Sequence, residues 1–265
     1  MRRAALLAAL FAVCIPVATA GSSAARVPRL SHVVVVLLEN HERSDVFAPG
    51  QMPTLQRYAH AYADLTNYTA VAHPSLPNYL ALVAGSTEGI TSDCTSCVAS
   101  GPTIGTSLTR AHESWGGYAE GYPDSTLFAK KHMPFLYFPG QASHVHPLTQ
   151  LDPHRLPAYA FVAPNLCDDA HDCPLSKADA FLARFLPPLL GVPKTAVFVV
   201  FDEGTTNIDG GGRVAALVLG TAVRAHAVSA QACNHYCLLR TAEDALGVGH
   251  LGASAGVAPL TGIWR

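Results

Sequence analysis

Short apolar runs alternate with amphipathic segments along most of the chain. Two runs rich in β-branched residues, at His32–Leu38 and Thr195–Phe201, have the composition of strands that are buried on both faces of a parallel sheet. Apolar residues at helical spacing lie between such runs. The pattern predicts further strands at Ala158–Ala163 and Arg213–Leu219, and helices at Met52–Tyr62, Ser75–Ala84, Lys177–Leu190 and His235–Gly247.

Strands that alternate with helices are typical of an α/β fold, here a three-layer sandwich around a mostly parallel central sheet. The stretch from residue 87 to residue 157 is rich in loops, and only short elements are expected there, at His112–Tyr118 and Ser125–His132. The sequence shows no internal repeat, linker or low-complexity segment. We therefore expect residues 21–265 to form a single domain.

The first 20 residues have the features of a secretory signal peptide. Arg2 and Arg3 precede an apolar stretch from Ala4 to Val17, and Ala18-Thr19-Ala20 resembles a cleavage site. The alternative is an uncleaved membrane anchor, but the apolar stretch is short for a span of ~20 residues. No later run is long enough to cross a membrane. We expect a secreted or periplasmic protein without a stable membrane anchor.

Cysteine usage agrees with export. Cys14 belongs to the leader, and the other six cysteines form three close pairs, which predicts local disulfides. A redox motif or a zinc site at the first pair is the alternative. The predicted disulfides are Cys94–Cys97, Cys167–Cys173 and Cys233–Cys237.

The net charge is -2, so no basic surface for nucleic acid is expected. The chemistry concentrates instead where the two most apolar strands end, at Glu39-Asn40 and at Asp202-Glu203. The carboxyl ends of parallel strands share one edge of a sheet, where ligands bind. Clustered carboxylates repel each other unless a cation lies among them, and oxygen donors suit magnesium, calcium or manganese. The alternative is that these acids cap the following helices.

Ser75 lies in the segment HPSLPNY at residues 73–79, at the predicted start of an apolar helix. A hydroxyl at this place faces free backbone N–H groups, which also suit a phosphate. The serine is therefore either a nucleophile or an ordinary helix cap. Capping alone leaves His73 and Asn78 unexplained.

Taken together, seven segments in this order resemble a bacterial and fungal phosphoesterase family. That family includes secreted acid phosphatases and phosphatidylcholine-type phospholipases C, and it belongs to the alkaline-phosphatase-like superfamily. The resemblance extends over residues 31–265 and implies the fold of that superfamily. Its carriers are HVVVVLLENH at 32–41, LTNYTAVAHPSLPNYLALVAGST at 65–87, KHMPF at 131–135, FVAPNLCDDAHDC at 161–173, FVVFDEG at 198–204, HYCLLRTAEDALG at 235–247 and TGIW at 261–264.

The resemblance also implies roles for individual residues. Ser75 resembles the nucleophile, which forms a phosphoserine intermediate and also binds the metal. The remaining ligands of a divalent cation of unknown identity are expected to be Glu39, Asn40, Asp202 and Glu203, although some relatives have a second aspartate in place of Glu203. Residues expected to bind phosphate or to protonate the leaving group are His132, His171 and His235, with Asn78 and His73 as further substrate contacts.

Other functions stay open at this stage. A phospholipase C would differ from an acid phosphatase in its leaving group, and the lack of a large extra C-terminal domain favours small phosphomonoesters. A non-catalytic phosphate-binding or surface-binding protein would not need the five ligand candidates. A sulfatase would need a segment of the Cys-x-Pro-x-Arg type, which the sequence lacks. The specific substrate and the oligomeric state do not follow from the sequence.

Overall fold

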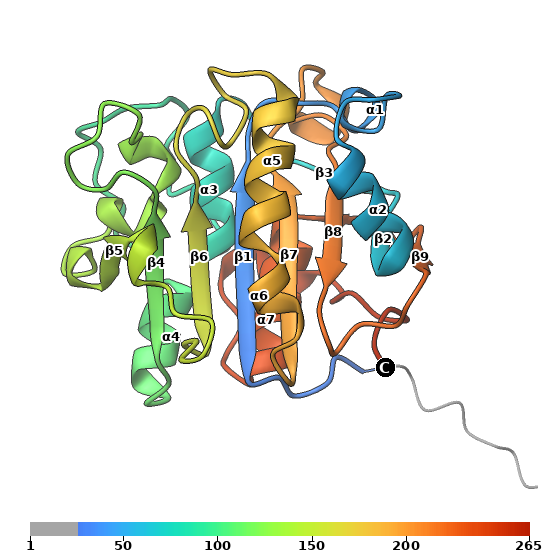
Figure 1. Ribbon diagram of the computed structural model, residues 1–265. Coiled ribbons are helices and arrows are strands. Elements are labelled where there is room, and N and C mark those ends of the chain that lie inside the picture. Colours follow the sequence, from blue (N-terminus) through green and yellow to red (C-terminus); the bar gives the residue numbers. More distant parts are fainter. Residues whose placement is uncertain (1–25) are drawn as a thin grey trace, which may run out of the picture.

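The computed structural model describes residues 26–265, so the predicted signal peptide at residues 1–20 lies outside the described part. An eight-stranded sheet with the order β5-β4-β6-β1-β7-β8-β2-β9 forms its centre, and every strand but β8 runs in the same direction (Figure 1). A second, two-stranded sheet pairs β10 with β3. The strands are β1 His32–Leu38, β2 Ala63–Leu65, β3 Tyr68–Thr69, β4 Trp115–Ala119, β5 Val145–Pro147, β6 Tyr159–Ala163, β7 Thr195–Phe201, β8 Ala216–Leu219, β9 Ala227–Ser229 and β10 Cys233–Asn234.

Helices cover both faces of the large sheet, with α2, α5 and α6 on one face and α3, α4 and α7 on the other (Figure 1). This arrangement confirms the predicted α/β fold with a mostly parallel sheet. None of the helices in the described part is long and apolar enough to cross a membrane. The helices are α1 Arg43–Val46, α2 Pro53–Ala61, α3 Ser75–Ala84, α4 Ile104–Arg110, α5 Leu175–Phe185, α6 Pro187–Leu190 and α7 His235–Leu246, and short 3-10 turns lie at Lys130–His132, Pro134–Tyr137, Ala142–His144, Leu148–Gln150, Ile208–Gly210 and Gly252–Gly256.

The two most apolar strands lie next to each other at the centre of the sheet. β1 and β7 pair in parallel over their full length, from His32 opposite Thr195 to Leu38 opposite Phe201. Apart from His32, every side chain of these strands is buried. Because the strands run in parallel and in register, the residues that follow them emerge together at one edge of the sheet.

Several elements differ from the sequence prediction. The helix expected at Lys177–Leu190 is divided into α5 and α6, since Pro187 cannot continue the first helix. The strand expected at Arg213–Leu219 is shorter and antiparallel to β7. Between residues 87 and 157, α4 has weak helix formers in its sequence IGTSLTR, and its Thr103 cap gives it a start that apolar spacing does not reveal.

The three predicted disulfides are present, with Cα atoms 5.7 Å apart in Cys94–Cys97, 4.7 Å apart in Cys167–Cys173 and 5.3 Å apart in Cys233–Cys237. Cys94–Cys97 lies in the loop between α3 and α4, Cys167–Cys173 lies just before α5, and Cys233–Cys237 joins β10 to the first turn of α7, so none links distant parts of the chain.

Candidate active site

The residues that follow β1 and β7 meet the first residue of α3 at the upper edge of the sheet in Figure 1. Ser75 is 1% exposed, and its Oγ lies 3.0 Å from Glu39 Oε2 and 3.3 Å from Glu203 Oε1. Asp202 accepts a hydrogen bond of 3.0 Å at Oδ1 from the backbone N–H of Asn40. Asn40 has a positive φ of 61°, which an asparagine tolerates better than most residues. The structure therefore brings Ser75, Glu39 and Glu203 into contact, and Asn40 joins Asp202 beside them through its backbone.

Burial raises the pKa values of all three carboxylates in this cluster. Burial, followed by the charge of Asp202, raises the pKa of Glu39 well above its ordinary value. Burial and the charge of Glu203 raise the pKa of Asp202 to about 7, and burial also raises the pKa of Glu203. Asp202 Oδ2 is buried and has no hydrogen-bond partner among the described residues. A buried acceptor without a partner, beside two more carboxylates, fits a hard divalent cation.

His132 faces the same cluster from the 3-10 turn at Lys130–His132. Its Nδ1 lies 3.0 Å from Asp169 Oδ2, and its Nε2 lies 3.1 Å from Glu39 Oε1 without hydrogen-bond geometry. The ring stacks on Tyr79, whose hydroxyl donates to Glu39 Oε1 at 2.5 Å. Burial and the charge of Lys131 lower the pKa of His132 well below its ordinary value. A neutral ring that donates from Nδ1 to Asp169 leaves Nε2 as a buried acceptor without a partner.

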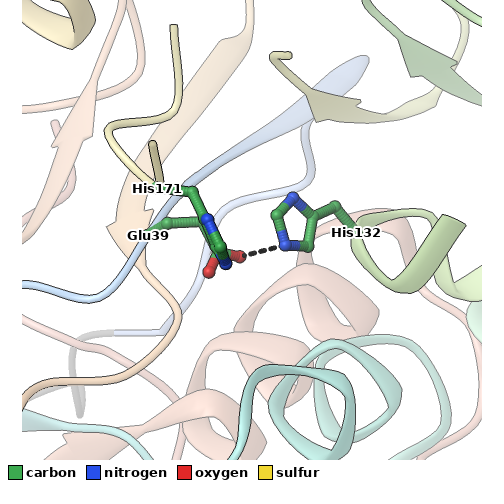
Figure 2. A group of neighbouring side chains, drawn as sticks. All are labelled: Glu39, His132 and His171. Atoms are coloured by element: carbon green, nitrogen blue, oxygen red, sulfur yellow. Dashed lines mark ion pairs between the residues drawn. The ribbon is translucent and has the colours of Figure 1, made fainter. Parts of the chain in front are cut away.

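One cluster of three potential metal-ligand side chains occurs in the part of the chain that the structure describes. It consists of Glu39, His132 and His171, whose ligand atoms lie within 4.8 Å of one another (Figure 2). His171 is the least available of the three as a metal ligand, because both nitrogens of its ring already have partners. Its Nδ1 lies 2.6 Å from Asp172 Oδ1, and its Nε2 lies 3.2 Å from the ammonium of Lys131.

Ser75 does not act as a helix cap. The cap position of α3 belongs to Pro74, which makes no side-chain cap hydrogen bond. The backbone N–H of Leu76 is instead accepted by Asp93 Oδ1 at 2.9 Å. Among the described residues, the Ser75 hydroxyl thus has only the carboxylates of Glu39 and Glu203 as partners. The N–H group of Leu76, one of those expected to face phosphate, is already bonded to Asp93.

Three further predicted residues support the loops around the site. Asn78 is fully buried, and its side-chain amide bonds to the backbone of Val71 and Ala72, so it holds the turn before Ser75. His235 is also fully buried, with Nδ1 2.9 Å from the Tyr68 hydroxyl and Nε2 2.6 Å from the carbonyl oxygen of Asp202. Burial lowers the pKa of His235 to about 4. Substrate contacts by Asn78 and His235 stay predictions.

His73 lies beside the cluster and is partly exposed. Its Nδ1 pairs with Glu203 Oε2, and its Nε2 lies 2.9 Å from the carbonyl oxygen of Thr206. Burial alone would lower the pKa of His73, but the hydrogen bond to Thr206 and the charge of Glu203 raise it overall. A protonated His73 at this place holds Glu203 toward Ser75.

Sequence reasoning missed several residues of the site. Tyr79 and Asp169 occur inside segments that carry the family resemblance, so their position was a usable signal. Asp93 had no such signal, since it lies in a loop beside a predicted disulfide. Glu42 was also missed; it accepts hydrogen bonds from the backbone of Thr205, Thr206 and Arg213 and fixes the loop after Glu203.

Comparison with known proteins identifies the family of the chain. The sequence profile of the Phosphoesterase family matches residues 41–249, and the chain belongs to that family. A phosphatidylinositol-3-phosphatase of Mycobacterium tuberculosis is 31% identical over 92% of this chain and 86% of its own length. A phosphate-repressible acid phosphatase of Penicillium chrysogenum is 32% identical over 61% of this chain, which spans 46% of the fungal protein. Membership confirms the prediction of a phosphoric ester hydrolase.

The fold has relatives among solved structures. A protein in the alkaline phosphatase superfamily from Vibrio parahaemolyticus superimposes with a TM-score of 0.61, covering 90% of this chain and 72% of its own. The two sequences are 11% identical, so this likeness concerns the fold alone. It confirms the predicted alkaline-phosphatase-like architecture.

Proposed function

We propose that this protein is an exported, metal-dependent phosphatase that uses Ser75 as its nucleophile. The observation that carries the proposal is the hydroxyl of Ser75, buried at the start of α3 between the carboxylates of Glu39 and Glu203. A buried serine that neither caps its helix nor contacts the backbone is best explained by a role in chemistry. Family membership supports phosphate as the group on which it acts.

The metal is proposed to be held by the carboxylates of Glu39, Asp202 and Glu203, with Asn40 and Ser75 completing the set. Asp202 Oδ2 and His132 Nε2 support this assignment, because both are buried and without partners. His132 follows a recurring pattern in which a metal-binding histidine bonds a carboxylate through its other nitrogen, here Asp169. A divalent cation at this site would neutralise the carboxylates and polarise the phosphate.

The chain's own residues account for the remaining steps of the proposed mechanism. The Ser75 hydroxyl gives its proton to an adjacent carboxylate as its Oγ forms a bond to phosphorus. The ester bond on the opposite side breaks, and the leaving oxygen takes a proton from water, because Nε2 of both predicted acids, His132 and His171, is an acceptor in this arrangement. Water then cleaves the phosphoserine and regenerates the hydroxyl. His235 holds the carbonyl of Asp202, which keeps the two strand ends in place.

The test replaces Ser75 with alanine and measures the rate at which a soluble aryl phosphate is hydrolysed, from the aryl alcohol that it releases. We expect turnover to fall by at least ~1,000-fold, because nucleophile removal in serine hydrolases costs this much or more. The circular dichroism spectrum and thermal midpoint should stay close to those of the wild type. Treatment with a chelator should abolish activity in the wild type, and added magnesium, manganese or calcium should restore it. An S75A variant with wild-type turnover would refute the nucleophile.

The substrate is proposed to be a phosphomonoester, with a phosphorylated lipid headgroup as a second candidate. The mycobacterial relative, which matches most of both chains, is named a phosphatidylinositol-3-phosphatase. Its name supports phosphate removal from a lipid rather than phospholipase C cleavage. Parallel assays with an aryl phosphate, vesicles containing phosphatidylinositol 3-phosphate, and phosphatidylcholine micelles would separate the three activities.

Export is proposed from the leader at residues 1–20 and is supported by the three disulfides. Mass spectrometry of protein recovered from the culture medium or periplasm would test this, since cleavage after Ala20 gives a mature chain that starts at Gly21.

A further inference from the structure

The side chains of two adjacent lysines near the site, Lys130 and Lys131, contact different parts of the protein. Lys130 Nζ lies 2.6 Å from the carbonyl oxygen of Thr95 and over the ring of Tyr137, at the surface. Lys131 Nζ lies 2.8 Å from Asp93 Oδ2 and 3.2 Å from His171 Nε2. Only Lys131 therefore reaches the cluster that surrounds Ser75.

The ring of His171 explains how Lys131 is bonded. Because Nδ1 of His171 lies 2.6 Å from Asp172 Oδ1, the ring proton belongs on Nδ1 and Nε2 is an acceptor. Lys131 donates to this acceptor. An ammonium group has three N–H donors, and the described residues accept from Lys131 at two places, Asp93 and His171. One donor thus has no protein acceptor.

Asp93 fixes the start of α3 as well as the lysine. Its Oδ1 accepts the backbone N–H of Leu76, the residue after Ser75, while its Oδ2 holds Lys131. A helix N-terminus usually offers such an N–H group to phosphate. Here a carboxylate already takes it, so a phosphate beside Ser75 needs another positive partner. The Lys131 ammonium is bonded to the same Asp93 carboxylate that takes this N–H group, so it lies beside the start of α3.

We propose that Lys131 binds a non-bridging phosphate oxygen of the substrate through its remaining N–H donor, and that Asp93 is the positioning residue that directs it. The proposal rests on the proposed phosphatase function. The carboxylates that hold the cation repel a phosphate dianion at longer range, and a fixed ammonium at the rim of the cluster offsets this repulsion. Asp93 ties the ammonium to the same helix that carries the nucleophile, so both move as one unit.

The experiment compares Lys131→Met with the matched control Lys130→Met, which removes the same charge one residue away. The probe is inorganic phosphate, with its dissociation constant measured by calorimetry at a fixed metal concentration and its inhibition constant measured in the aryl phosphate assay. A hydrogen bond to a charged group is worth about 1.5–3 kcal/mol, so K131M should weaken phosphate binding by about 10- to 100-fold. K130M should stay within about two-fold of the wild type.

Two further variants separate binding from positioning. Lys131→Arg keeps the charge and should recover part of the lost affinity. Asp93→Asn keeps an acceptor for the Leu76 N–H group but loses the ion pair, so it should weaken phosphate binding less than K131M, by about 3- to 10-fold. If K131M unfolds, the comparison of K131R with the wild type provides the same test, because a rigid two-partner site does not accept guanidinium without some loss.

An unchanged phosphate dissociation constant in a folded K131M variant would overturn the proposal and leave the phosphatase function intact. Equal losses of phosphate affinity in K131M and K130M would also overturn it, since they would show that the effect comes from the overall positive charge of the surface and not from a specific contact. Failure of the function itself would appear separately, as full activity in S75A.

Discussion

Buried carboxylates occur in two kinds of surroundings in this protein. Away from the active site, Asp179 accepts the backbone N–H groups of Thr54 and Leu55 at 3.1 and 2.9 Å, at the start of α2. Glu243 likewise accepts the N–H of Leu251 at 2.9 Å, and its other oxygen lies 2.6 Å from Ser254 Oγ. Each of these carboxylates has backbone N–H donors as partners.

The carboxylates at the strand ends lack this compensation. Asp202 has one bonded oxygen and one buried oxygen without a partner, and it lies beside Glu39 and Glu203. Burial of an uncompensated charge costs of order several kcal/mol. The protein therefore gives up stability at one edge of the sheet, which binding of the proposed cation there would restore. Burial of an acid is thus a poor sign of function by itself, and an unsatisfied oxygen is a better one.

The sharpest test of this comparison is Asp202→Asn. The substitution keeps the shape and the acceptor for the Asn40 N–H group but removes one charge from the cluster. We expect activity to fall by at least ~100-fold, while the metal-free protein gains about 1–3 kcal/mol of unfolding free energy. Added divalent metal should raise the thermal midpoint of the wild type more than that of D202N. A loss of metal-free stability in D202N would contradict the comparison.

The same exchange at Asp179 should have the opposite sign. An asparagine there presents an amide group to one of the two N–H donors of α2, so one donor is left without a partner. We expect D179N to lose about 1–3 kcal/mol of unfolding free energy in urea titrations. Its activity at 25 °C should match the wild type, since α2 does not carry a site residue. Equal stability of D179N and wild type would show that this carboxylate is not a structural cap.

The last expected effect concerns the pH dependence of stability. Burial raises the pKa of Glu243 from its ordinary value of 4.5 to about 7. The folded protein therefore binds this proton more tightly than the unfolded chain, and the contribution of Glu243 to stability falls as pH rises from 4.5 to about 7. Glu243→Gln should flatten the pH dependence of unfolding in this window. The contributions of the other titrating groups cancel when the unfolding free energies of the two proteins are subtracted. Identical slopes of unfolding free energy against pH in the two proteins would refute the effect.

Much of this arrangement could be predicted from the sequence, because it depends on local chemistry. The bounds of β1, β7 and α3 follow from apolar runs and from Gly85, which ends α3 with a φ of 67°. Two strands that end in acidic residues were enough to place Glu39 and Asp202 at one edge. Family resemblance added the proposed nucleophilic role of Ser75, which physical reasoning alone could not distinguish from a cap.

The remainder depends on contacts between distant segments. The Asp93 carboxylate reaches α3 and Lys131 from a loop without a regular pattern. The direction of β8 depends on how the chain returns after Glu203, which apolar composition does not encode. Glu42 looks like an ordinary loop acid in the sequence, and Asp169 is marked only by its place in a segment of the family resemblance. The fold shows that Asp169 orients His132 and that Glu42 orients the loop after β7.

The three disulfides have a consequence for the maturation of the enzyme. They join cysteines only 3, 6 and 4 residues apart, so they add little to the stability of the sheet by restricting the unfolded chain. Their loops instead adjoin or enclose Asp93, Asp169, His171 and His235. A chain that folds under reducing conditions would have its sheet but a loosely held catalytic edge. If the chain is exported as proposed, oxidation outside the cytoplasm would then complete the proposed active site of a chain that is already folded.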